Sequence, residues 1–158
     1  YKRQEIEGID GKSFLKALFG KEKEHRRFAY GIHNNIPEGT AYPIRSIRDK
    51  RYKLILNLTP EVEYFEKNLM NLKNERSVWA SWIESTKTDK RARYFVDRYV
   101  KRPAIEFYDM QKDPWELNNL AEEKKYAKRI AMMKGELEAW MRQQGDTGAQ
   151  MDVKIKKQ

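Results

Sequence analysis

The sequence lacks the residue types that most often carry catalysis or bind metals. It has no cysteine among its 158 residues and only two histidines, which excludes disulfides, thiolate metal sites and a cysteine-derived nucleophile within this chain. It shows no glycine-rich phosphate loop, no metal-spaced cluster of histidines and carboxylates, and no Ser-His-Asp set. No apolar run approaches the roughly 20 residues of a membrane span. We therefore expect neither a complete active site nor a membrane span in this chain.

The beginning of the chain also lacks a recognisable start. Residues Tyr1 to Glu5 resemble neither a signal peptide nor a natural N-terminus. We therefore expect a piece of a longer protein, and the residues themselves leave the compartment open.

Positive charge is abundant: 33 Lys and Arg against 24 Asp and Glu give a net charge of +9. Such a balance favours polyanionic partners, such as nucleic acid, an anionic polysaccharide or an acidic protein surface. The charges are spread along the whole sequence, however, which is also what solvated helix faces produce.

Hydrophobic periodicity predicts an α+β fold. Alternating β-favouring residues indicate antiparallel strands at about 28–32, 44–48, 52–58 and 105–110. A final helix is predicted from about Glu122 to Gln144, ended by Gly145. Its narrow apolar stripe consists of Tyr126, Ile130, Met133, Leu137 and Trp140. We expect this helix to cover one face of the sheet.

Further helices are predicted before and between the strands. A short helix capped by Asp10 or Ser13 and stopped by Gly20 is expected to bury its apolar residues, Phe14, Leu15, Leu18 and Phe19. Spacings of three and four predict helices over 62–72, 78–86 and 92–100, which form an insertion at about 61–101. The four tryptophans occupy positions expected to bury them, and we expect the polar tail 146–158 to fray or to lie on a partner.

The corner at residues 113–122 joins the last strand to the final helix. Asp113 before Pro114, with Glu116 three residues after Asp113, predicts a capped helical turn. Asn119, three residues before Glu122, predicts a second helix cap.

The candidate binding residues lie in and after an irregular loop. His33, Asn34 and Glu38 offer a donor and acceptor array that could hold a polar substrate, although loops contain such residues for turn formation alone. Nearby guanidinium groups suit sulfate or phosphate, but they also protect a solvated sheet face; these cations are Arg45, Arg48, Arg51 and Lys53.

Three stretches resemble, in the right order, the C-terminal part of the type I sulfatases. The stretches are residues 9–20 (IDGKSFLKALFG), residues 43–55 (PIRSIRDKRYKLI) and residues 107–121 (FYDMQKDPWELNNLA). The last is similar to the family's D-P-x-E-x-x-N-L-A signature. The loop from His33 to Tyr42 and the insertion with Trp79 and Trp82 are most similar to the heparan N-sulfatase (sulfamidase) branch.

The resemblance implies an alkaline-phosphatase-like enzyme acting on sulfate esters or sulfamates of glycosaminoglycan-type sugars. Its larger N-terminal α/β domain would hold a formylglycine nucleophile, made from Cys or Ser, and a Ca²⁺ site. This chain shows neither motif and no catalytic residue of its own. It corresponds to the C-terminal subdomain at residues 21–145, with 1–20 linking it to the catalytic domain and 146–158 as a polar tail.

The implied partners are the sulfated sugar and the protein's own N-terminal catalytic domain, with no nucleic acid. The implied location is periplasmic, or secreted or lysosomal. Within this chain the resemblance points to His33, Asn34 and Glu38 as substrate contacts, with Arg45 as an anion contact, on the wall of the substrate pocket. Two alternatives stay open: a phosphonate or phosphodiester hydrolase of the same superfamily, and a free-standing basic module that binds polyanions.

Overall fold

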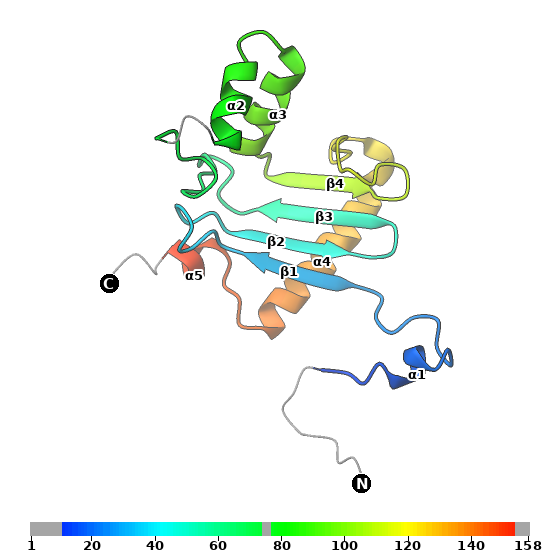
Figure 1. Ribbon diagram of the computed structural model, residues 1–158. Coiled ribbons are helices and arrows are strands. Elements are labelled where there is room, and N and C mark those ends of the chain that lie inside the picture. Colours follow the sequence, from blue (N-terminus) through cyan, green and yellow to red (C-terminus); the bar gives the residue numbers. More distant parts are fainter. Residues whose placement is uncertain (1–10, 74–76, 154–158) are drawn as a thin grey trace.

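The computed structural model describes residues 11–73 and 77–153, which form one antiparallel sheet with helices on both of its sides (Figure 1). The sheet has four strands in the order β1-β2-β3-β4. They are β1 (Ala29–His33), β2 (Ile44–Arg48), β3 (Tyr52–Asn57) and β4 (Ile105–Asp109). The predicted fold class and all four predicted strands are confirmed. No strand end differs from its predicted position by more than one residue.

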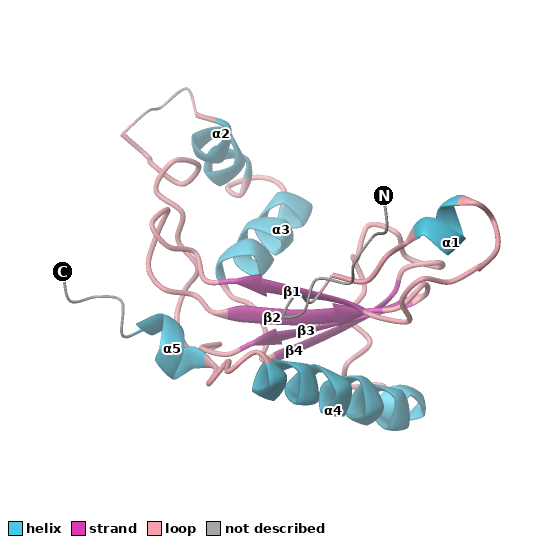
Figure 2. Cartoon of the chain, turned by 90° about the horizontal axis from the view of Figure 1, so that it is seen from below, coloured by secondary structure: helices cyan, strands magenta, loops and turns pink. Residues whose placement is uncertain are grey.

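Helix α4 (Ala127–Gln143) packs along one face of this sheet (Figure 2). The register places Leu54 opposite both Ile47 and Phe107, so these three side chains point to the same face. Met133 and Leu137 of α4 are fully buried against them. The predicted apolar stripe is therefore confirmed, because period two on the strands and period 3.6 on the helix meet in one core.

The final helix begins later than predicted. Residues Lys124–Tyr126 form a 3-10 turn, η1, and α4 follows directly. At the other end Gly145 adopts φ 68° and its amide bonds the Arg142 carbonyl at 3.1 Å. A left-handed residue of this kind favours glycine and ends the helix, as predicted.

A second, smaller core lies under the insertion, where α2 (Val78–Ser85) and α3 (Lys90–Val100) pack together. Ser77 and Asp89 cap these helices through bonds to the amides of Ala80 and Arg91, at 3.0 and 2.7 Å. The helix predicted over 62–72 is wrong. Glu66 instead accepts bonds from the amides of Asn68 and Leu69, and this local turn replaces helical bonding.

The first helix, α1 (Leu15–Leu18), is present but buries none of its residues. Phe14 is 62% exposed and Phe19 is 68% exposed, so the prediction that this helix packs into the core is wrong for this chain. Gly20 ends the helix with φ 68°, as predicted. The cap prediction for Asp10 lies outside the described residues.

The corner after β4 is a turn stabilised by side-chain hydrogen bonds and not a helix. The prediction of a capped helical turn at this position is therefore wrong. Asp113 accepts a bond from the Asn118 amide at 2.7 Å, so its carboxylate closes the turn across five residues. Glu116 adopts φ 55° and does not reach back to the cap. Its carboxylate instead bonds Lys53 Nζ on β3 at 2.8 and 2.9 Å, because the strand offers a cation nearby.

Asn119 holds the corner to the edge of β4 and does not cap a helix. Its side-chain oxygen accepts bonds from the amides of Phe107 at 2.9 Å and Ala121 at 3.0 Å. Its amide group donates to the Ile105 carbonyl at 3.1 Å, and the Leu120 amide donates to the Phe107 carbonyl at 2.8 Å. The corner thus satisfies the free backbone groups of an edge strand.

Replacing Asn119 with alanine is expected to cost about 1–3 kcal/mol of stability, because the Phe107 amide loses its acceptor. Asn118→Ala is the matched control, since that residue contributes its backbone amide to the turn. Thermal unfolding and hydrogen exchange at Phe107 measure the difference. Equal stability of the two variants would contradict this role.

Of the two outcomes expected for residues 146–158, fraying does not hold for residues 146–153, the part of this segment that the structure describes. Residues 146–153 return to the sheet and end in the short helix α5 (Ala149–Val153), where Asp146 and Asp152 are buried. Among the helices described, none has the length and apolar character to cross a membrane.

Candidate functional site

The loop between β1 and β2 is held by buried polar contacts. Asn35 is left-handed, with φ 63°, and its buried side chain donates to the carbonyls of Thr40 at 3.0 Å and Phe65 at 2.7 Å. Gly39 pairs with Glu66 in an isolated bridge, and a Cβ at this glycine would collide with the Phe65 carbonyl oxygen. The loop is therefore held in place from within, and its exposed side chains include Glu38.

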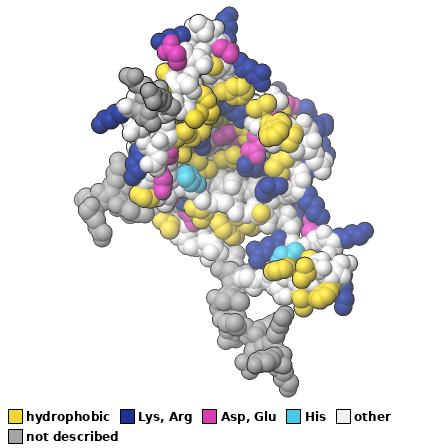
Figure 3. All heavy atoms as spheres, viewed as in Figure 1, with side chains coloured by type: hydrophobic (Ala, Val, Ile, Leu, Met, Phe, Trp, Pro, Cys, Tyr) yellow, Lys and Arg dark blue, Asp and Glu magenta, His cyan; other side chains and the backbone are white. Residues whose placement is uncertain are grey.

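His33 and Glu38 are the two predicted site residues that the loop leaves exposed. His33 is the last residue of β1 and pairs with Ile44. By the alternation of side chains, His33 lies on the sheet face opposite α4. This is the face seen in Figure 3, where hydrophobic and charged side chains intermingle. Both residues are thus free to meet a ligand.

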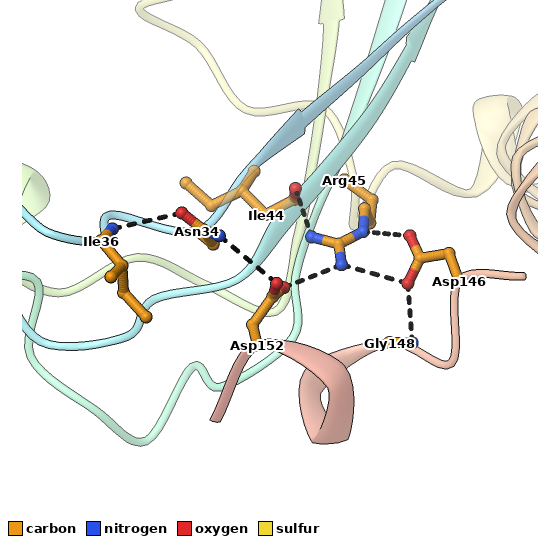
Figure 4. Close-up of polar contacts among 7 residues, drawn as sticks. All are labelled: Asn34, Ile36, Ile44, Arg45, Asp146, Gly148 and Asp152. Atoms are coloured by element: carbon orange, nitrogen blue, oxygen red, sulfur yellow. Dashed lines mark hydrogen bonds and ion pairs between the residues drawn. The ribbon is translucent and has the colours of Figure 1, made fainter. Parts of the chain in front are cut away.

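Arg45, in contrast, lies on the α4 side of the sheet, since it stands two residues before Ile47 on β2. It is 1% exposed. Its guanidinium forms a bidentate contact with Asp146 and donates to Asp152 at 2.8 Å and to the Ile44 carbonyl at 3.1 Å (Figure 4). These bonds hold the pKa of the Asp146 carboxyl below its usual value.

Asn34 belongs to the same cluster. Its side-chain oxygen accepts a bond from the Ile36 amide at 3.2 Å, and its amide group points to Asp152 at 3.5 Å (Figure 4). The structure therefore divides the predicted site into an exposed pair, His33 and Glu38, and an anchoring pair, the half-buried Asn34 and the buried Arg45. We call the set of Asn34, Arg45, Asp146 and Asp152 the Arg45 cluster.

Sequence reasoning missed the two carboxylates of this cluster. They lie 101 and 107 residues beyond Arg45, in a polar segment without periodicity. The one local signal is Gly145, which ends α4 and allows the chain to turn back toward the sheet.

A hollow of about 680 Å³ lies between the insertion helices and the corner, and we call it the α3 cleft. Its walls include three exposed aromatic residues, Trp82, Phe95 and Trp115, and the half-buried Tyr99. Arg91 and Arg98 of α3 also line it. Trp82 is 44% exposed and Trp115 is 80% exposed. The prediction that all four tryptophans are buried is therefore wrong for these two, since their flanking elements leave the cleft open between them.

Buried polar groups fix the base of the α3 cleft. Tyr108 donates to Glu106, and Glu106 also accepts from Asn57 at 2.8 Å. Arg98 donates to the Tyr108 hydroxyl at 2.7 Å and to the carbonyls of Glu116 and Leu117. Burial, together with the bond to Glu106, raises the pKa of Tyr108. The hydroxyl therefore stays protonated at neutral pH, and its bond with Arg98 links β4 to the corner.

The described residues do not fit the Ca²⁺ site that the family resemblance implies. Over 11–73 and 77–153, no group of three or more His, Asp or Glu side chains could hold a metal ion. The buried carboxylate pair, Asp146 and Asp152, is already bound to Arg45. With no cysteine in the sequence, a formylglycine precursor of that type is absent as well.

Comparison with curated proteins identifies the homologues of this chain as sulfatases. Two ulvan-active sulfatases of Formosa agariphila are 35% and 28% identical over 146 and 151 residues, each covering 89% of this chain. Human N-sulphoglucosamine sulphohydrolase is 25% identical over 141 residues, covering 84% of it. The chain spans about a quarter of the length of these relatives, between 23% and 26%. No family model matches the chain.

Solved structures show the same fold. One was determined in complex with its substrate D-glucosamine-2-N,6-O-disulfate and matches with a TM-score of 0.54 at 21% identity, covering 91% of this chain and 22% of its own. A 2-O glycosaminoglycan sulfatase matches with a TM-score of 0.52 at 21% identity, covering 90% of this chain and 22% of its own. The four-stranded sheet with its packed helix is thus a unit found within sulfatases.

Proposed function

We propose that this chain is the C-terminal subdomain of a sulfatase that hydrolyses sulfate esters or sulfamates on sulfated polysaccharides. One observation carries the proposal: 89% of the chain aligns with an ulvan-active sulfatase at 35% identity. In the whole enzyme, an N-terminal domain would supply the formylglycine nucleophile and Ca²⁺, and this subdomain would supply part of the substrate-pocket wall. A periplasmic, secreted or lysosomal location accompanies this proposal.

Glycosaminoglycan-type sugars are the proposed substrate class. The human relative is named for N-sulphoglucosamine, and one structural neighbour holds a glucosamine disulfate. The heparan N-sulfatase branch is the narrower form of the proposal. The ulvan-active relatives are more similar in sequence than the human one, so ulvan oligosaccharides belong in the same test.

The proposed substrate contacts are His33 and Glu38. His33 ends β1 and Glu38 lies on the loop that follows; both are exposed, and contacts of Asn35 and Gly39 hold this loop in place. Specificity commonly resides on loops held by a rigid scaffold. Asn34 and Arg45 act behind them as positioning residues. The Arg45 cluster ties the start of this loop to the segment after α4, so the contacts keep their place when a ligand binds.

Sulfate release by the full-length protein tests the proposal, with glucosamine N-sulfate, heparan sulfate oligosaccharides and ulvan oligosaccharides as substrates. His33→Ala and Glu38→Ala are each expected to raise KM about tenfold, the equivalent of one lost hydrogen bond of about 1.4 kcal/mol. Lys128→Ala, an exposed change on α4, is the matched control. Unchanged kcat/KM in both loop variants would refute the assigned contacts.

The alternatives give different outcomes in the same assay. A phosphonate or phosphodiester hydrolase would release no sulfate but would cleave a phosphodiester. A free-standing basic module would bind heparin with an affinity that falls steeply with salt, and it would turn over neither substrate.

A further inference from the structure

The turn that contains Trp115 includes a residue in an unfavourable backbone conformation. Glu116, the next residue, has φ 55°, a left-handed conformation that is unfavourable for a residue with a Cβ. Such a conformation persists where the surroundings hold it. Here Asp113 binds the Asn118 amide, Lys53 binds the Glu116 carboxylate, and Arg98 binds the Glu116 and Leu117 carbonyls.

These contacts hold the backbone of the turn, while the indole of Trp115 contributes little to the core. Trp115 is 80% exposed, although a buried indole would contribute more to stability than most other side chains. Trp82 and Phe95 line the same cleft from α2 and α3 and are also exposed. Three aromatic residues from separate elements therefore border one hollow.

The charge of the α3 cleft favours an anionic ligand. Its walls carry three arginines, Arg91, Arg98 and Arg102, against two carboxylates, Asp89 and Glu116, and Glu116 is neutralised by Lys53. Arg91 is exposed, with its guanidinium 5.7 Å from the Phe95 ring centroid, and it has no ion pair within the part of the chain that the structure describes. An exposed guanidinium that is not engaged in an ion pair can bind a sulfate group.

We infer that the α3 cleft binds a sulfated saccharide unit, with a sugar ring stacked on Trp115 and a sulfate group held by Arg91. The ligand class rests on the proposed function. The apolar face of a sugar ring fits an indole, and the hollow of about 680 Å³ lies within the range of pockets that hold small ligands, about 300–1,000 Å³.

Titration calorimetry of the full-length protein with a heparin-derived hexasaccharide and with an ulvan oligosaccharide tests this site. Trp115→Ala is expected to raise Kd about tenfold, the usual effect of losing one stacking platform. Arg91→Gln is expected to raise Kd and to reduce the slope of log K against log salt by about one. The matched controls are Arg93→Gln, on the same helix but outside the cleft lining, and Phe19→Ala, an exposed aromatic elsewhere.

The outcomes separate this site from the proposed function. Sulfate release together with Kd values within twofold of wild type in both cleft variants overturns the site and leaves the enzyme proposal intact. Selective loss of binding in a protein that releases no sulfate supports the site and refutes the enzyme proposal. A fall in the melting temperature of more than about 5 °C in Trp115→Ala overturns the site, because the indole would then pack against another part of the protein.

Discussion

Replacing Arg45 with methionine is expected to lower the free energy of unfolding by about 3–5 kcal/mol, the usual cost of removing one partner from a buried ion pair. The guanidinium is 1% exposed and bonds two carboxylates. Methionine fills part of the volume but leaves Asp146 and Asp152 buried, close together and without a counter-charge. The segment 146–153 should then detach from the sheet. Urea unfolding measures the loss, and proteolysis within 146–153 reports the detachment.

Arg48→Met is the matched control for this variant. Arg48 lies three residues along the same strand and is exposed, so its change should stay within about 0.5 kcal/mol. A second variant, Arg45→Met with Asp146→Asn and Asp152→Asn, removes all three charges and should recover part of the loss. A loss below about 1 kcal/mol for Arg45→Met would show that the Arg45 cluster does not hold the segment.

The loss of stability caused by Arg45→Met should depend on pH, because Arg45 binds the titratable carboxyl group of Asp146. Bonds from Arg45 lower the folded-state pKa of Asp146, so the unfolded chain binds the proton more readily. This contribution to stability is fully present above the carboxyl's unfolded pKa, about 3.9, and is lost as pH falls through the lower folded pKa. The difference between wild type and Arg45→Met should therefore be largest near neutral pH and should shrink in strong acid. Unfolding measured at several pH values tests this; a difference that grows toward acid would contradict it.

Phe107→Ala is expected to destabilise the protein as much as Arg45→Met does, lowering the free energy of unfolding by about 3–5 kcal/mol. Phe107 is 0% exposed at the centre of the main core. Its ring stacks on Tyr52 at a centroid distance of 5.3 Å and contacts Tyr126 at 5.6 Å. Truncation therefore opens a cavity between β3, β4 and the start of α4, where three elements meet and cannot all move inward.

Phe107→Leu is the graded control, because it keeps most of the buried volume and should cost under about 1.5 kcal/mol. Tryptophan fluorescence during urea unfolding follows both variants, with Trp140 as a reporter on α4. Similar losses for alanine and leucine would show that the stability of this site depends on the aromatic contacts and not on filled volume.

The sheet and its helix were predictable because their signals are local and agree with one another. Hydrophobic residues recur every two positions in β3 and every 3.6 positions in α4. These patterns predict as core the residues that the structure buries, such as Leu54 and Leu137. Gly20 and Gly145 ended their helices where predicted, since a left-handed residue favours glycine. The stretches that carry the family resemblance include Gly20 and the start of β3, and the homologues are sulfatases.

Three of the errors arose where one side chain had more than one available partner. Glu116 was expected to bond the turn that precedes it, but Lys53 on a neighbouring strand takes its carboxylate. Asn119 was expected to cap a helix, and it binds the edge of β4 instead. Glu66 bonds two nearby amides where a helix was predicted. Propensity describes each segment in isolation, and tertiary contacts then select among the alternatives.

The sequence by itself determined the class of fold, the strands, the core face of the last helix and the resemblance to sulfatases, because each depends on the order of residue types along the chain. Only the tertiary structure decided where the candidate residues lie and what they contact. It exposed His33 and Glu38, buried Arg45 between two distant carboxylates, and left Trp115 and Arg91 on the walls of one cleft. Burial and pairing depend on groups that lie far apart in sequence, and no local pattern specifies which of them meet.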